Sequence, residues 1–122
     1  MNMRGGGSGR WSGPGCVYVM EYRNGVGNYY KIGYTARDPN ERLQEVQRDE
    51  KNYNISLVGS VKANEMRGAE TAAQQAAKSI GLVKDPNRGG ATDWFIGPAT
   101  QQQVLDAIRP AVYYHNAKNK IP

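Results

Sequence analysis

The sequence predicts an α+β domain, an α/β sandwich in which a small three-stranded antiparallel sheet is flanked by helices in the order β-β-α-β-α-(β)-α. Two runs of β-branched and aromatic residues, 16–22 and 29–35, flank a turn-forming Asn24-Gly25 pair, which predicts an antiparallel hairpin. Three later segments have apolar residues at the three-to-four spacing of helices. With 122 residues, the chain fits one small domain and is too short for two.

The first 15 residues are rich in Gly and Ser and hold few apolar side chains. Such a segment cannot bury enough surface to order itself, so we predict a flexible tail at residues 1–15 and a single domain at residues 16–122. Arg4-Gly5-Gly6 is similar to repeats in nucleic-acid-binding tails, but a single copy favours an inert tail.

Strand alternation assigns the hairpin side chains to two faces. Successive residues of a strand point to opposite sides of the sheet. If Val17, Val19 and Ile32 point into the core, Tyr18 and Lys31 emerge together on the opposite face. The hairpin therefore predicts a tyrosine and a lysine side by side.

A strong helix start follows the second strand. Asp38 fits the N-cap, Pro39 the first helical position and Glu41 the capping-box partner. With Val46 facing the core, Arg42 lies beside the apolar stripe near the N-terminal end of this helix. Arg42 is therefore expected close to the end of the second strand.

The rest of the chain predicts a third strand at residues 55–61, two further helices, and a short edge strand or turn at residues 92–96. The second helix runs from a cap at Asn64 to Ile80, and Glu70 lies at the edge of its narrow, alanine-rich apolar stripe. The last helix begins near residue 98 or 100, and Pro110 should kink or end it. Its predicted buried residues are Val104, Leu105, Ile108 and Val112.

Composition limits the function classes. Lys plus Arg number 16 against 11 for Asp plus Glu, a formal charge of +5, which suits a polyanionic partner but also simple solubility. One cysteine and one histidine exclude an intrachain disulfide framework and zinc sites of the Cys/His type. No apolar run approaches the roughly 20 residues of a membrane helix, and no signal-peptide core is present, so we expect an intracellular protein that does not bind membranes.

Several short motifs occur in a fixed order along the chain. They are Val17-Tyr18-Val19, Lys31-Ile-Gly-Tyr-Thr35, Arg42, Glu70 and Asp93-Trp-Phe95. This pattern resembles the GIY-YIG nuclease superfamily, and within it the phage-type branch whose second motif reads Lys-Ile-Gly-x-Thr. The resemblance covers roughly residues 15–96. It implies a three-stranded antiparallel sheet flanked by helices, and a phage or bacterial origin with action in the cytoplasm of a bacterium or phage-infected host cell.

The resemblance also implies a catalytic site made of Tyr18, Lys31, Arg42 and Glu70, with one Mg²⁺ (or Mn²⁺) bound by Glu70. Hydrolysis of a phosphodiester requires a deprotonated water and cations that neutralise the phosphate oxygens. A nearby ammonium such as that of Lys31 favours the phenolate of Tyr18. Arg42 has a planar guanidinium group whose N–H groups can donate to two phosphate oxygens at once. Mg²⁺ keeps most of its waters and accepts few protein carboxylates, which suits a single Glu70.

Further contacts to nucleic acid, DNA rather than RNA, are expected from Arg37, Arg67, Tyr34 and Gln74. Gln74 stands where the phage-type branch commonly has a histidine, and an amide cannot carry protons. Each residue also has a structural interpretation: Tyr18 as an ordinary strand tyrosine, Lys31 as a solvated strand residue, and Arg42 as an ion-pair partner of Glu41 or Glu45. Trp94 and Phe95 are expected in the core, and His115 is assigned no role.

Two hypotheses for function follow. The first is a small metal-dependent DNA endonuclease, a hydrolase that uses Tyr18, Lys31, Arg42 and Glu70. The second is a catalytically impaired GIY-YIG-like module that binds nucleic acid or inhibits a nucleic-acid-processing enzyme. The second is favoured by Gln74 in place of histidine and by the alanine-rich helix around Glu70.

Overall fold

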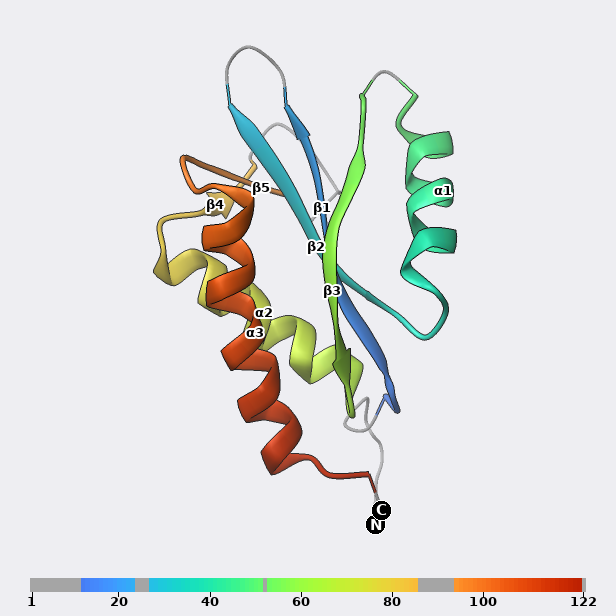
Figure 1. The fold of residues 1–122 in the computed structure, drawn as a ribbon, viewed down its shortest axis with the longest axis vertical. Helices are drawn as coiled ribbons and strands as arrows, with labels where there is room; N and C mark the ends of the chain where they lie inside the picture. Colours follow the sequence, from blue (N-terminus) through green and yellow to red (C-terminus); the bar gives the residue numbers. More distant parts are fainter. Residues whose placement is uncertain (1–11, 24–26, 52, 86–93, 122) are drawn as a thin grey trace.

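The computed structural model describes residues 12–23, 27–51, 53–85 and 94–121, and it confirms the α+β class. A five-stranded antiparallel sheet carries three helices in the order β-β-α-β-α-β-β-α (Figure 1). Across the sheet the strands lie in the order β3-β1-β2-β5-β4. The elements are β1 (Gly15–Arg23), β2 (Asn28–Thr35), α1 (Pro39–Asp49), β3 (Ser56–Ala63), α2 (Met66–Ser79), β4 (Val83–Lys84), β5 (Trp94–Gly97) and α3 (Gln101–Lys118).

The predicted hairpin is present. β1 pairs antiparallel with β2 from Cys16 opposite Thr35 to Arg23 opposite Asn28, and its other edge pairs with β3. The predicted turn residues Asn24 and Gly25 lie outside the described residues. Because β1 has a strand on each side, it is an interior strand of the sheet.

The two faces of the sheet bury separate hydrophobic clusters. Val17, Val19 and Ile32 pack with α2 and α3 on one face, as alternation predicts. Tyr18 and Met20 pack on the other face with Val46 of α1. Figure 1 shows the same division, with α1 on one side of the sheet and α2 and α3 on the other. Every residue of β1 between its two ends is buried, so both faces of the strand lie in the interior.

Two short strands extend the sheet beyond β2. β5 pairs antiparallel with Asn28–Lys31, and β4, only two residues long, pairs with β5. Trp94 and Phe95 of β5 are fully buried, one on each face, which confirms their prediction as core residues. A two-residue strand has no alternation of its own, which explains why the sequence pattern does not indicate β4.

Local capping explains where α1 begins. The Asp38 side chain accepts a hydrogen bond from the Asn40 N–H at 2.9 Å, and Pro39 occupies the first turn. Glu41 does not form the expected capping box with Asp38. Its carboxylate instead lies 3.7 Å from Nη1 of Arg37, an exposed pair one turn apart.

The N-cap of α2 is Glu65 rather than the predicted Asn64. Glu65 is buried, at 4% exposure, and its carboxylate accepts a hydrogen bond from the Gly68 N–H at 3.1 Å. Asn64 instead contacts Asn116 of α3. At the other end, Gly81 has φ +101°, a left-handed conformation that favours glycine and ends the helix as predicted.

α3 starts at a complete capping box, in which Thr100 and Gln103 exchange side-chain and backbone hydrogen bonds. The helix continues through Pro110 to Lys118, so the prediction that it could end at Pro110 is wrong. Its predicted core residues, Val104, Leu105, Ile108 and Val112, are all buried. Within the described ranges no helix is long and apolar enough to cross a membrane.

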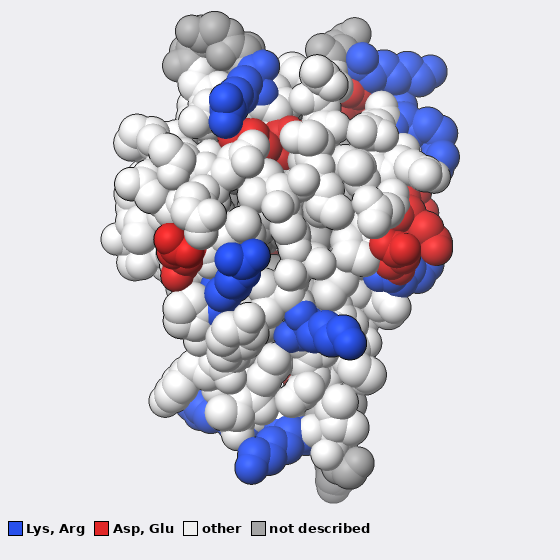
Figure 2. Space-filling model, viewed as in Figure 1, with Lys and Arg blue, Asp and Glu red and all other residues white. Residues whose placement is uncertain are grey.

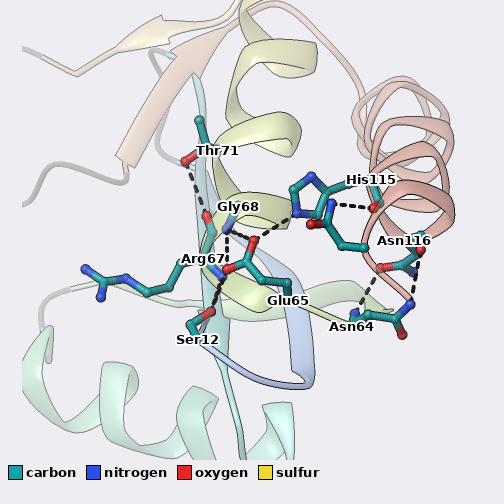
Figure 3. Close-up of polar contacts among 9 residues, drawn as sticks. Ser12, Asn64, Glu65, Arg67, Gly68, Thr71, His115 and Asn116 are labelled. Atoms are coloured by element: carbon teal, nitrogen blue, oxygen red, sulfur yellow. Dashed lines mark hydrogen bonds and ion pairs between the residues drawn. The ribbon is translucent and has the colours of Figure 1, made fainter. Parts of the chain in front are cut away.

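Polar contacts tie three distant segments together at the start of α2 (Figure 3). The Ser12 hydroxyl donates to Glu65 Oε2 at 2.7 Å, and Nε2 of His115 lies 2.9 Å from Glu65 Oε1. The Met66 N–H donates to the Gly13 carbonyl at 3.0 Å. The predicted tail falls mostly on residues 1–11, outside the described residues, whereas Ser12 and Gly13 contact α2. The hydrogen bonds to Glu65 hold its pKa below the ordinary 4.5, against the effect of burial, which raises it.

Gly33 should be intolerant of a side chain. It lies opposite Tyr18, and a Cβ at position 33 would come 2.6 Å from Cζ of the Tyr18 ring. We expect Gly33→Ala to lower the free energy of unfolding by about 1–3 kcal/mol, measured by urea denaturation. Gly27→Ala is the matched control because its Cβ would meet Ile96 at an ordinary 3.8 Å. Equal effects of the two substitutions would contradict this packing.

The Glu65 contacts predict a pH dependence. Because the folded pKa lies below the unfolded value, the carboxylate stabilises the fold fully above about pH 4.5 and loses this contribution as the pH falls through the folded pKa. We expect Glu65→Gln to cost about 1–3 kcal/mol at pH 7. The difference between wild type and variant, measured by urea denaturation, should shrink at pH 3. A difference that stays constant down to pH 3 would contradict the assignment.

Candidate functional site

The centre of the candidate site is a contact between β1 and α1. Nε of Arg42 donates to the Tyr18 hydroxyl at 3.3 Å. Tyr18 is buried, at 1% exposure, whereas the Arg42 side chain is 31% exposed. The first turn of α1, set by the Asp38 cap, carries Arg42 over the strand. The structure therefore brings together two of the four predicted catalytic residues, with the phenol beneath the guanidinium.

Glu45 joins this arginine to a second one. Its Oε1 accepts from Nη1 of Arg42 at 3.1 Å, and its Oε2 lies 2.8 Å from Nη2 of Arg37. Hydrogen bonds from Arg37 and Arg42 lower the pKa of Glu45. Burial lowers the pKa of Arg42, but contacts with Tyr18 and Glu45 outweigh it, so the net shift is upward. The contacts with Tyr18 and Glu45 thus keep the Arg42 guanidinium charged.

Lys31 lies on the same face as Tyr18, as strand alternation predicts. Tyr18 pairs with Gly33, two residues beyond Lys31, so the two are diagonal neighbours with Cα atoms about 7–8 Å apart in such a pair. The Lys31 ammonium lies 5.6 Å from the centroid of the Trp94 ring, and the residue is only 7% exposed. Lys31 is therefore a nearly buried cation over an aromatic face and not a solvated strand residue.

The edge of β2 next to Tyr18 extends beyond its partner strand. β5 pairs with β2 only as far as Lys31, so residues 32–35 have no described strand on that side. Thr35 accepts a hydrogen bond from the Arg37 N–H at 3.1 Å, which directs the chain from β2 into α1. Gly33, opposite Tyr18, has no side chain to cover this edge. The motif Lys31-Ile-Gly-Tyr-Thr35 thus forms one wall of the site.

Glu70 approaches the same edge from α2. Nε2 of Gln74 donates to the Ile32 carbonyl at 2.9 Å, and a Cβ built on Gly15 would meet both Met66 Sδ and the Thr35 carbonyl at 2.6 Å. α2 therefore runs along β2 from Thr35 towards Ile32. Glu70 is half-buried and lies one turn before Gln74 on the same side of the helix, beside residues 33–35. α2 packs on the face opposite α1, so Glu70 and Arg42 come from helices on opposite faces of the sheet.

The predicted nucleic-acid contacts lie in different places. Arg37 joins the arginine cluster and is 53% exposed. Tyr34 is half-buried on the α2 face, and Arg67 is exposed on the first turn of α2, its side chain pointing away from the Glu65 cluster in Figure 3. On the face of the molecule shown in Figure 2, Lys and Arg side chains are spread over several elements, and the largest group of acidic side chains lies over α1. The net charge of +5 is therefore not gathered in one patch on the face shown.

A metal ion would find one carboxylate at this edge. Among the residues that the structure describes, no group of three or more His, Cys, Asp or Glu side chains could hold a metal. A half-buried Glu70 fits Mg²⁺, which retains several waters and needs few protein ligands. Asp93, the acidic residue of the last motif, lies outside the described residues.

Two features of the site were not assigned by sequence reasoning. Glu45 was considered only as a surface partner of Arg42, yet it contacts both arginines. The Trp94 indole N–H donates to Glu50 Oε2 at 3.0 Å, which fixes the ring that lies under Lys31. The spacing of Arg42 and Glu45, three residues apart on a helix, indicated the first pair. Nothing local indicated the second, because its partners are 44 residues apart.

A family model described as the T5orf172 domain matches residues 15–111, from the start of β1 into α3. No curated protein and no solved structure matches the chain. The chain therefore belongs to the T5orf172 domain family, which is related to the GIY-YIG nucleases.

Proposed function

We propose that this protein is a small metal-dependent endonuclease that hydrolyses phosphodiester bonds in DNA. Within the GIY-YIG relationship we assign it to the phage-type branch with the Lys-Ile-Gly second motif. The observation that carries the proposal is the Arg42–Tyr18 contact beside the edge of β2 that no described strand covers. A partly exposed guanidinium over a buried phenol at an open edge suits an incoming phosphate better than a purely structural pair.

Arg42 binds the phosphate. Two of its five N–H donors serve Tyr18 and Glu45, and the others can reach two phosphate oxygens in the bidentate geometry that arginine favours. Its raised pKa keeps the guanidinium charged, so it neutralises the charge that develops on the phosphorus oxygens.

Tyr18 orients the attacking water and accepts its proton. The N–H donated by Arg42 stabilises negative charge on the phenolic oxygen, and Lys31 adds a second cation on the same face. Because Tyr18 is almost completely buried, its hydroxyl is held in one position by the ring packing on Gly33. This rigidity favours a single geometry for the water.

Glu70 holds the metal ion, Mg²⁺ or Mn²⁺. When bound, the ion supplies charge neutralisation at the phosphate and at the leaving oxygen. Gln74, one turn further along α2, donates to the Ile32 carbonyl and so fixes the distance between Glu70's helix and the strand edge. Gln74 is therefore a positioning residue, and Glu70 acts from a helix anchored to β2.

A second function is favoured by specific observations. Tyr18 is 1% exposed, Arg42 is engaged by Glu45, and the amide of Gln74 is used on the backbone of β2. A protein with these features could bind nucleic acid, or inhibit a nucleic-acid-processing enzyme, without turnover. Binding without cleavage would then be the whole activity.

We expect metal-dependent cleavage of fluorescent single-stranded or duplex oligonucleotides, abolished by EDTA and restored by Mg²⁺. Tyr18→Phe, Glu70→Gln and Arg42→Lys should each lower kcat/KM by about 10²–10⁴-fold. They remove the proton acceptor, the metal ligand and the bidentate phosphate contact, respectively. Asp49→Asn and Arg48→Lys, both exposed in the last turn of α1, are matched controls and should cleave normally.

Oligonucleotide binding separates the two functions. Salt-sensitive binding with no cleavage in any metal, weakened by Arg42→Ala, would support the binding module and reject the endonuclease. Unchanged cleavage and binding in all three site variants would reject the site itself.

Glu45 gives a second prediction. Its carboxylate competes with phosphate for Arg37 and Arg42 but also holds Arg42 in place. We expect Glu45→Gln to bind DNA about two- to five-fold more tightly at low salt and to have a lower kcat. Glu41→Gln makes the same charge change beside Arg37 alone, at 3.7 Å, and should leave kcat unchanged. A parallel fall of affinity and kcat in Glu45→Gln would contradict a positioning role.

A further inference from the structure

The C-terminal part of α3 lies beyond the family match. The match ends at residue 111, whereas α3 continues to Lys118. The last acidic residue of the chain is Asp106, and the 16 residues that follow contain three cations, Arg109, Lys118 and Lys120. This end of the helix therefore carries only positive formal charge.

Hydrogen bonds, and not core packing, hold this end in place. The last buried apolar residue of α3 is Val112. Beyond it, His115 contacts Glu65 at 2.9 Å (Figure 3). Nδ2 of Asn116 donates to the Lys62 carbonyl at 2.9 Å. The Asn116 side-chain oxygen also accepts from the Asn64 N–H at 2.9 Å. One side of the helix end is thus fixed to α2 and β3.

The other side presents two tyrosines to solvent. Tyr113 is 59% exposed and Tyr114 is 68% exposed. The Lys118 ammonium lies 5.2 Å from the centroid of the Tyr114 ring, one helical turn away. Adjacent exposed aromatic rings on a fixed helix are typical of an interaction site and add nothing to the core. We call Tyr113, Tyr114 and Lys118 the C-terminal tyrosine surface.

We propose that the C-terminal tyrosine surface binds a single-stranded segment of nucleic acid, apart from the Arg42 site. The class of partner rests on the proposed function. The rings offer planar faces on which bases stack, and Lys118 contacts the adjacent phosphate. Charge favours nucleic acid over a protein partner, because lysine is depleted in protein interfaces and no acidic residue follows Asp106. In Figure 2 the coloured side chains at the lower end, over this part of α3, are almost all basic.

The C-terminal tyrosine surface gives the domain a second place at which it contacts its substrate. The polar contacts that fix the helix end keep the two rings oriented, which lowers the entropy lost on binding. The strand is held at two places on one rigid domain.

Fluorescence anisotropy with a labelled oligothymidylate and a duplex of equal length tests this surface, with the full chain in EDTA to prevent cleavage. We expect Tyr113→Ala/Tyr114→Ala to weaken single-strand binding about 5- to 100-fold and duplex binding much less. Tyr113→Phe/Tyr114→Phe keeps the rings and should retain the affinity. Lys118→Gln should lower the salt slope by about 0.7. Val83→Ala/Lys84→Gln alters a comparable exposed pair on β4 and should change nothing.

The outcomes separate this inference from the proposed function. Unchanged single-strand binding in the double alanine variant, with binding still lost in Arg42→Ala, would overturn the surface and leave the endonuclease proposal standing. A dimer that the alanine variant dissociates in analytical ultracentrifugation, with single-strand binding unchanged, would show that the surface joins two copies of the chain and would also overturn the inference.

Discussion

The domain is organised around a central strand that is buried on both faces. β1 lies between β3 and β2, with α1 on one side of the sheet and α2 and α3 on the other. A polar group on such a strand is removed from water and needs a partner. Tyr18 finds one in Arg42, and the buried Glu21 finds partners in Arg23 and Gln101. Because Tyr18 is buried on β1, its hydroxyl needs a hydrogen-bond partner. The contact with Arg42 that supplies this partner also forms the candidate site.

The site has two unequal halves. On the α1 side, Tyr18, Arg42, Glu45 and Arg37 form a continuous chain of hydrogen bonds and ion pairs that fixes two guanidinium groups. On the α2 side, the proposed metal ligand Glu70 lies on a helix anchored to β2 through Gln74. Phosphate binding thus has the more elaborate structural support. The proposed metal-binding half depends on Glu70.

Glu65 connects α2 to segments near both ends of the described chain. It caps α2, accepts from Ser12 and contacts His115, so the position of α2 depends on a polar network as well as on its alanine stripe. Alanine side chains bury little area, and a helix with such a narrow apolar face benefits from further anchors. The same network orders the end of α3 past the family match. The histidine that was assigned no role is thus part of the support for Glu70's helix.

The sequence by itself determined the α+β class, the hairpin and the N-cap at Asp38. It also determined which side chains of β1 and β2 point to which face of the sheet, because alternation and capping act over a few residues. It also indicated the residues that we propose for phosphate chemistry. Only the tertiary structure decided that Tyr18 lies beneath Arg42, that Lys31 lies over Trp94, and that Glu65, not Asn64, caps α2 through contact with a histidine 50 residues away. These contacts depend on how α1, α2 and α3 pack on the sheet. Local periodicity fixes the face of an element, but only packing fixes its neighbour on that face.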